Sequence, residues 1–157
     1  MEEQQKFMRE AIRLSIENVK SGNGGPFGAV VVKNGEIIAS GANEVTSSND
    51  PTAHAEVVAI RKACEKLGTF QLDDCEIYCS CEPCPMCLGA IYWARPAKIY
   101  YANTKTDAAE IDFDDDFIYK EIELPVDKRK LLTDQLLRDE ALKAFSLWNE
   151  SQNKTEY

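Results

Sequence analysis

Pro83-Cys84-Pro85-Met86-Cys87 is the stretch around which the chain is organised, and the one histidine of the 157-residue sequence, His54, stands 30 positions before Cys84. The two cysteines are three positions apart, so at the start of a helix both sulfurs point toward one face. Pro85 suits the first position of that helix, where a backbone N–H has no partner in any case. The unpaired N–H groups and the helix dipole at this end favour thiolates, the form of cysteine that binds metal.

The histidine belongs to a second short motif, His54-Ala55-Glu56. Two thiolates and one neutral imidazole are typical of an open zinc site, whose fourth position holds water. We expect a helix that opens at Pro51-Thr52-Ala53, with His54 in its first turn, so that two helix N-termini converge on one ion. Zinc lowers the pKa of such a water toward about 7 and so supplies hydroxide at neutral pH. Glu56 is the nearest unligated acid, and we predict that it takes the proton from this water and hands it to the leaving group.

Other interpretations of the cysteine pair remain open. A lone C-x-x-C also occurs in redox pairs, although the tryptophan that flanks the thioredoxin pair is lacking here. A closed structural zinc site needs a fourth ligand, which Cys79 or Cys81 could supply. The protein could also be a zinc-stabilised binding module without turnover, but such a site has no use for the free carboxylate of Glu56.

The elements around the two motifs indicate a sheet covered by helices. Asn34-Gly35 between two β-branched runs predicts a hairpin of the strands Phe27–Lys33 and Glu36–Ser40. The stretch Asn43–Asp50 is polar and predicts a loop. Apolar spacing and turn residues predict the other elements, which are helices at 2–20, 51–67, 85–94 and 139–149 and strands at 76–80 and 98–102. The order α, β, β, α, β, α, β predicts an α/β fold in one domain that covers residues 1–157.

The composition limits the partners of the protein. It has 18 basic and 27 acidic residues, a net charge of −9, and such a surface repels a nucleic acid backbone. The first residues lack the features of a signal peptide, and no apolar run reaches the roughly 18 residues of a membrane span. We therefore expect a cytoplasmic protein that binds neither nucleic acid nor membrane, with its six cysteines reduced.

The two motifs together resemble a known family. H-x-E followed by P-C-x-x-C is the pattern of zinc nucleobase deaminases. The chain resembles the cytidine and deoxycytidylate deaminase superfamily and, within it, the bacterial guanine deaminases. The resemblance implies a three-layer α-β-α cytidine-deaminase-like fold with a mixed central sheet. It is weakest at Pro125–Leu137. It extends to Gly24–Ala29, Asn49–Glu56, Gly89–Arg95, Phe113–Asp115 and Glu156-Tyr157.

The resemblance also implies a reaction, in which hydroxide supplied by Zn²⁺ attacks C2 of guanine, leaving xanthine and ammonia, while Glu56 shuttles protons. The zinc ligands that it implies are His54, Cys84 and Cys87. The substrate residues that it implies are Asn43 and Asp115 at the polar edge of the purine, Phe27 and Trp93 at its faces, and Tyr157 in a lid.

The family likeness further implies a homodimer whose C-terminal segments, from about residue 138 to 157, are exchanged between subunits. Each of the five substrate residues also has a purely structural explanation, as a turn former, a core residue, a solvated charge or a chain end. A tRNA adenosine deaminase shares the fold and the motifs and is the main alternative, against which the net charge of −9 argues.

Overall fold

The computed structural model describes residues 2–113 and 115–157; Met1 and Asp114, the latter within one of the stretches that resemble the family, lie outside them. The chain divides into two compact units, Met1–Asp116 and Phe117–Tyr157, and each is described by itself. The expectation of a single domain over 1–157 stays a prediction.

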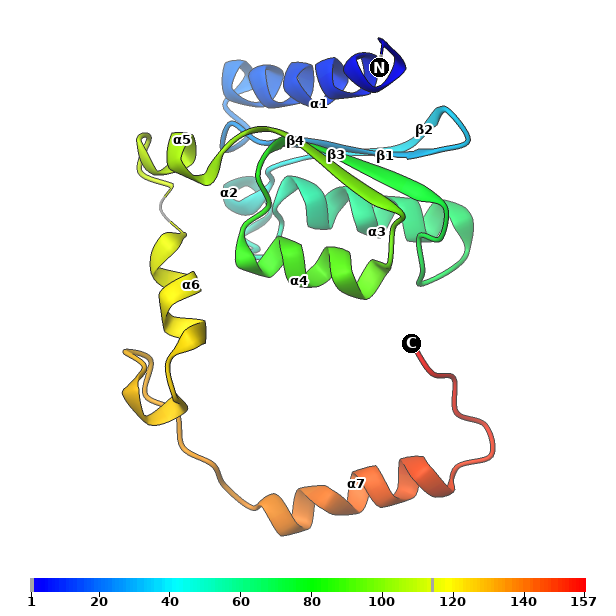
Figure 1. Ribbon diagram of the computed structural model, residues 1–157, viewed down its shortest axis with the longest axis vertical. Helices are drawn as coiled ribbons and strands as arrows, with labels where there is room; N and C mark the ends of the chain where they lie inside the picture. Colours follow the sequence, from blue (N-terminus) through cyan, green and yellow to red (C-terminus); the bar gives the residue numbers. More distant parts are fainter. Residues whose placement is uncertain (1, 114) are drawn as a thin grey trace. The chain divides into compact units, whose positions relative to one another are not determined.

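The first unit is built on a four-stranded sheet with helices on both faces (Figure 1). Its strands are β1 (Gly28–Lys33), β2 (Glu36–Ala42), β3 (Cys75–Cys81) and β4 (Lys98–Asn103), arranged in the order β2-β1-β3-β4. The strand β1 is antiparallel to both β2 and β3, whereas β3 and β4 are parallel. The predicted mixed sheet and the predicted hairpin are therefore confirmed.

The strands bury alternate residues on opposite faces, as the period of a strand requires. On one face, Val30 and Tyr78 pack with Phe7 of the helix α1 (Glu2–Ser21). On the other face, Val31 and Ile77 belong to a larger core together with residues of α3 (Ala55–Leu67) and α4 (Pro85–Ala94). Figure 1 shows α1 above the sheet and the other two helices below it. The predicted three-layer α-β-α arrangement is thus confirmed.

The predicted start of α4 agrees with the structure, whereas the predicted start of α3 does not. The helix α4 begins at Pro85 and ends at Ala94, as predicted. The helix α3 begins at Ala55 rather than near Pro51, so the prediction that His54 lies in its first turn is wrong. The reason is a turn that competes with the helix: the Asp50 carboxylate accepts hydrogen bonds from the backbone N–H and the hydroxyl of Thr52, at 2.8 and 2.7 Å.

The segments that connect the larger elements contain two short helices that the sequence did not predict. The helix α2 (Val45–Ser48) lies within the expected loop Asn43–Asp50, and α5 (Lys105–Ala109) follows β4. A capping box forms at the start of α5, where Thr104 and Asp107 exchange side-chain-to-backbone hydrogen bonds.

The second unit is helical. It contains α6 (Asp116–Glu123, whose first residue belongs to the first unit), the 3₁₀ turn η1 (Val126–Lys128) and α7 (Arg138–Glu150), which was expected at 139–149. Neither α6 nor α7 contains a buried residue, although both carry large apolar side chains. Among the described residues, no helix has the length and apolar composition needed to cross a membrane.

Candidate metal centre and active site

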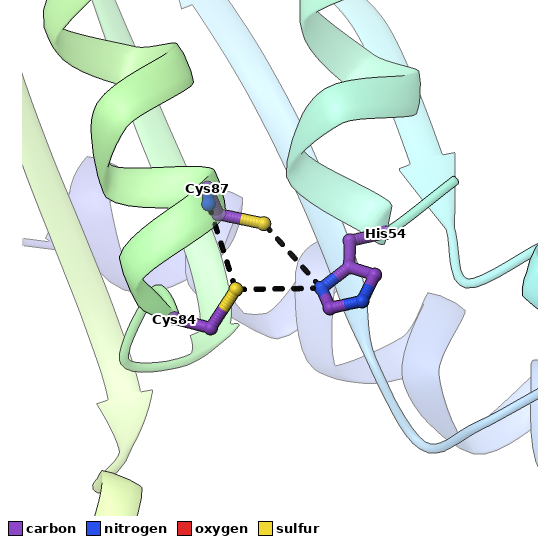
Figure 2. A group of neighbouring side chains, drawn as sticks. All are labelled: His54, Cys84 and Cys87. Atoms are coloured by element: carbon purple, nitrogen blue, oxygen red, sulfur yellow. Dashed lines mark hydrogen bonds between the residues drawn. The ribbon is translucent and has the colours of Figure 1, made fainter. Parts of the chain in front are cut away.

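The side chains of His54, Cys84 and Cys87 converge on one point from the starts of α3 and α4. The Nδ1 atom of His54 lies 3.5 Å from the Sγ atom of Cys84 and 3.5 Å from that of Cys87 (Figure 2). The three ligand atoms all lie within 4.8 Å of one another. Zn–S bonds of about 2.3 Å and Zn–N bonds of about 2.0–2.1 Å at tetrahedral angles would place sulfur and nitrogen roughly 3.5–3.6 Å apart. The residues present therefore fit a zinc ion, with one tetrahedral position left open.

The helix termini fix these ligands. His54 is the N-cap of α3, and Cys84 is the N-cap of α4. The Cys84 sulfur accepts a hydrogen bond from the backbone N–H of Cys87 at 3.5 Å, and Pro85 occupies the first turn as predicted. Both ligand-bearing ends are positive ends of helix dipoles, which favour the thiolate. The prediction that two helix N-termini converge on one metal site is confirmed, with His54 just outside its helix.

The hydrogen bonds among the three side chains shift their pKa values strongly. The hydrogen bond with Cys87, and after it that with His54, lowers the pKa of Cys84 to about 4. The hydrogen bond with Cys84 raises the pKa of Cys87 and also that of His54. These shifts favour a thiolate at Cys84 with a proton held on its neighbours. A divalent cation replaces such a proton and neutralises both sulfurs.

Glu56 lies beside the cysteines. Its Oε2 atom is 3.4 Å from Sγ of Cys87, and its side chain is buried. Burial raises the pKa of this carboxyl above its ordinary value. In the part of the chain that the structure describes, the potential ligand group consists of His54, Cys84 and Cys87 without Glu56. The carboxyl thus combines a raised pKa with a position next to the site, which are the properties of a general acid and base.

The alternatives for the other cysteines are not supported by the geometry. Cys79 and Cys81 are buried in β3, and neither belongs to the ligand group found among the described residues. The Cys81 thiol donates instead to the backbone oxygen of Thr104, at a sulfur–oxygen distance of 3.5 Å. None of the six cysteines forms a disulfide bond.

A cavity of about 380 Å³ opens next to the ligands, a volume within the range of small-molecule sites. His54, Glu56 and Cys84 form one part of its wall. Other lining residues come from the segment before β1, the segment after β2 and the chain after β4. They include Gly25, Phe27, Asn43, Lys105, Phe113 and Asp115.

The sequence comparisons agree with this site. Residues 1–103 match the model of the cytidine and deoxycytidylate deaminase zinc-binding region, and this range contains all three ligands and Glu56. The chain belongs to this deaminase family. The zinc cofactor predicted from the sequence is confirmed by the family, and the geometry brings the three predicted ligands together; the ligand role of each residue stays a prediction.

Two comparisons cover nearly the whole deaminase chain. Guanine deaminase of Bacillus subtilis is 60% identical over 96% of this chain and 97% of its own length. The crystal structure of guanine deaminase from the same organism superimposes with a TM-score of 0.95 at 59% identity, and the match covers 98% of each chain. The resemblance to bacterial guanine deaminases is therefore confirmed.

The tRNA deaminases match less of the chain. The tRNA-specific adenosine deaminase of Aquifex aeolicus is 42% identical over 61% of this chain and 63% of its own length. The shorter match is expected for two deaminases that share the zinc-binding region and differ outside it.

Three of the five predicted substrate residues lie around the cavity of the deaminase. Asn43 is buried, and its Oδ1 atom accepts a hydrogen bond from the backbone N–H of Val45 at 3.2 Å. The Phe27 ring stands edge-on to Phe113, with ring centroids 5.0 Å apart. Asp115 lines the same cavity.

The other two predicted substrate residues are not brought to the cavity within the first unit. Trp93 is 63% exposed on α4 and lies outside the residues that line the cavity. Tyr157 is 69% exposed and belongs to the second unit. Substrate roles for all five residues stay predictions. Phe113 was missed as a cavity residue, although it stands in one of the stretches that resemble the family, because a single aromatic residue in an acidic loop gives no local signal of a pocket wall.

Proposed function

We propose that the protein hydrolyses guanine to xanthine and ammonia. The observation that carries the proposal is the 60% identity to a guanine deaminase across nearly the full length of both chains. The arrangement of His54, Cys84 and Cys87 beside the buried carboxyl of Glu56 supports a hydrolytic deaminase independently of that likeness. Guanine is a small neutral base, which also suits a chain with a net charge of −9.

The chemistry divides between the metal and Glu56. His54, Cys84 and Cys87 would hold a zinc ion, which would lower the pKa of water so that hydroxide is available at neutral pH. Glu56 accepts the proton that this water loses and delivers it to a ring nitrogen of the base. The oxygen of water bonds to C2 of guanine, and the bond between C2 and the exocyclic nitrogen then breaks. For this cleavage Glu56 takes the remaining proton from the oxygen now bonded to C2 and passes it to the exocyclic nitrogen, which leaves as ammonia while C2 becomes a carbonyl carbon of xanthine. A raised pKa suits a carboxyl that must carry both protons.

The cavity offers groups that match a purine. The amide of Asn43 and the carboxylate of Asp115 supply donors and acceptors for the polar edge of the base. The ring of Phe27, supported by Phe113, supplies an aromatic face. Concave sites lined mainly by apolar side chains, with a few polar groups, are typical of small-molecule binding.

We further propose a homodimer in which C-terminal segments, from about residue 138 to 157, are exchanged and each brings Tyr157 to the site of the partner subunit. The exposed apolar side chains of α7, such as Phe145 and Leu147, support this proposal, because a folded chain rarely leaves such a helix without a partner surface. Trp93, on the first unit, is also a large exposed aromatic residue, like those of α7. The cytoplasmic location rests on the sequence and stays a prediction.

The test is a comparison of substrates with one preparation of zinc-loaded protein. Ammonia release is measured with guanine, adenine, cytosine and a tRNA anticodon stem-loop, and bound zinc is quantified in the same sample. We expect release from guanine that exceeds every other substrate. Deamination of the stem-loop with guanine left intact would establish a tRNA adenosine deaminase instead. Zinc-loaded protein that releases ammonia from none of them would favour the zinc-stabilised binding module.

A further inference from the structure

Asn18 is a buried polar residue near the end of α1 to which the proposed mechanism gives no role. Only 6% of its surface is exposed. Its side-chain nitrogen Nδ2 donates to the backbone oxygen of Gly25 at 2.8 Å and to that of Asn43 at 2.9 Å. Asparagine is a poor choice for a helix interior, so its use at a buried position indicates that these two hydrogen bonds matter.

The two acceptors belong to segments that meet only because the chain has folded. Gly25 lies between α1 and β1, and Asn43 follows β2, and both residues line the cavity. The backbone N–H of Asn43 also donates to the backbone oxygen of Phe27 at 3.1 Å. Asn18 is thus the side chain that joins the loop of the aromatic wall to the loop of the cavity amide.

The junction is packed at backbone distance. A Cβ atom on Gly24 would lie 2.2 Å from the Asn43 oxygen and 3.1 Å from Nδ2 of Asn18, so glycine is required at this position. Asn18 donates to the segments on both sides of this junction, so its two hydrogen bonds help to fix the position of the Asn43 backbone. Displacement of a substrate-contacting group by about 1 Å can cost 10²-fold in activity, which gives this packing a functional meaning.

From this geometry we propose that Asn18 is a positioning residue for recognition of the base, acting through Asn43 and secondarily through the Phe27 loop. The inference rests on the proposed deamination of guanine. Loss of the two donors removes the hydrogen bond to the buried Asn43 oxygen and leaves the Gly25 oxygen with only the backbone N–H of Phe27, at 2.9 Å, so the Asn43 segment relaxes away from Gly25. Substrate binding suffers, whereas the zinc ligands and Glu56, which lie at the starts of α3 and α4, keep their positions.

The first experiment measures kcat and KM for guanine, zinc content and melting temperature of Asn18→Ala and Asn18→Ser. In Asn18→Ala we expect KM to rise by about tenfold or more with kcat changed by less than about threefold and one zinc per chain. Asn18→Ser keeps one donor, so its KM should lie between those of Asn18→Ala and the wild type. It also serves as the test if Asn18→Ala fails to fold. Ser15→Ala is the matched control, because Ser15 is a buried polar residue of the same helix whose hydroxyl donates within α1, to the backbone oxygen of Ile12. Its KM should stay at the wild-type value.

The second experiment is a double-mutant cycle with Asn43→Ala. If Asn18 acts through Asn43, the loss of kcat/KM in the double variant should fall short of the product of the two single losses by at least about fivefold. Losses that multiply, an unchanged KM, or an equal rise of KM in Ser15→Ala would overturn the proposal. A wild-type protein that deaminates a different base would refute the proposed substrate alone, and the same cycle on that base would still decide the role of Asn18.

Discussion

At the residue scale the chemistry depends on a carboxyl that is next to the metal site without being part of it. Glu56 is buried, with its Oε2 atom 3.4 Å from the sulfur of Cys87, and the proposed mechanism assigns the proton transfer to this carboxyl. Substitution Glu56→Gln keeps the shape of the side chain and removes its ability to carry a proton. We expect zinc content to remain at one per chain and kcat to fall by about 10²–10⁴-fold.

Atomic absorption and steady-state ammonia release on the same samples check this prediction. Glu65→Gln is the matched control, since Glu65 is an exposed carboxylate of the same helix, α3, and should keep full activity. A Glu56→Gln protein with wild-type kcat would mean that another group carries the proton.

A second prediction at this scale concerns the ligands. Cys84→Ala removes the thiolate that also caps α4, so the metal loses one of three ligands and the helix loses its N-cap acceptor. We expect zinc affinity to fall by about 10²-fold or more, since loss of an outer partner alone costs 10–100-fold, and activity to fall in parallel. Titration with a competing chelator measures the affinity. Cys64→Ala is the control, because it changes a thiol outside the ligand group, and it should bind zinc like the wild type. Full zinc affinity in Cys84→Ala would mean that the metal binds elsewhere.

At the element scale, local signals decided which boundaries could be predicted. Pro85 at its start and Arg95-Pro96 after its end specify α4, and both act within one helical turn. The start of α3 was misplaced because Pro51 and Thr52 suit the first turn of a helix and a turn equally well. The outcome depends on the Asp50 side chain and on the backbone bond from Glu44 to Ala53, a contact between separate segments.

In the candidate site, too, the residues set by local motifs could be predicted, whereas those set by contacts between separate segments could not. The ligands and Glu56 could be predicted, because zinc chemistry restricts residue types and spacing within two short motifs. The junction of Asn18 with Asn43 could not, because it joins residues 25 positions apart through the packing of α1 against the sheet. Phe113 was missed for the same reason, since only its contact with Phe27 makes it part of a wall.

Close packing of α3 on β2 gives a prediction for these elements. A Cβ atom on Gly41 would lie 2.3 Å from the backbone oxygen of Ala55 and 2.7 Å from the nitrogen of Ala59. Gly41→Ala should push the first turn of α3, which carries Glu56, away from the sheet. We expect a loss of about 1–3 kcal/mol in the free energy of unfolding, together with weaker zinc binding.

Urea unfolding monitored by circular dichroism measures this loss. Gly89→Ala is the control, because apart from the adjoining residues and the backbone of α4 itself no atom of the described residues lies within 4 Å of its Cβ position, and alanine favours a helix interior. Its stability should stay unchanged or rise by up to about 1 kcal/mol. A Gly41→Ala protein as stable as the wild type would show that α3 can move without cost.

At the scale of the whole molecule, the two units differ in how their apolar side chains are covered. The first unit has a core on each face of its sheet, whereas no residue of α7 is buried and its apolar side chains remain exposed. A helix of this kind is stable only when another surface covers its apolar side. Sequence periodicity predicts the helix, but it does not say whether the covering surface belongs to the same chain or to a second copy.

The proposed exchange of C-terminal segments can be tested by complementation between two inactive chains. One chain carries Glu56→Gln and an intact C-terminal segment; the other carries an intact metal site and Tyr157→Ala with Phe145→Asp, which damage that segment. If each segment closes the site of the partner subunit, a mixed dimer has one complete site, and refolding an equal mixture should restore about a quarter of wild-type activity. If each segment serves its own chain, every site in the mixture stays defective and the activity should not exceed the sum of the two variants. Because both variants have the same zinc ligands, equal zinc content in all samples ensures that the restored activity reports the exchange and not metal loading.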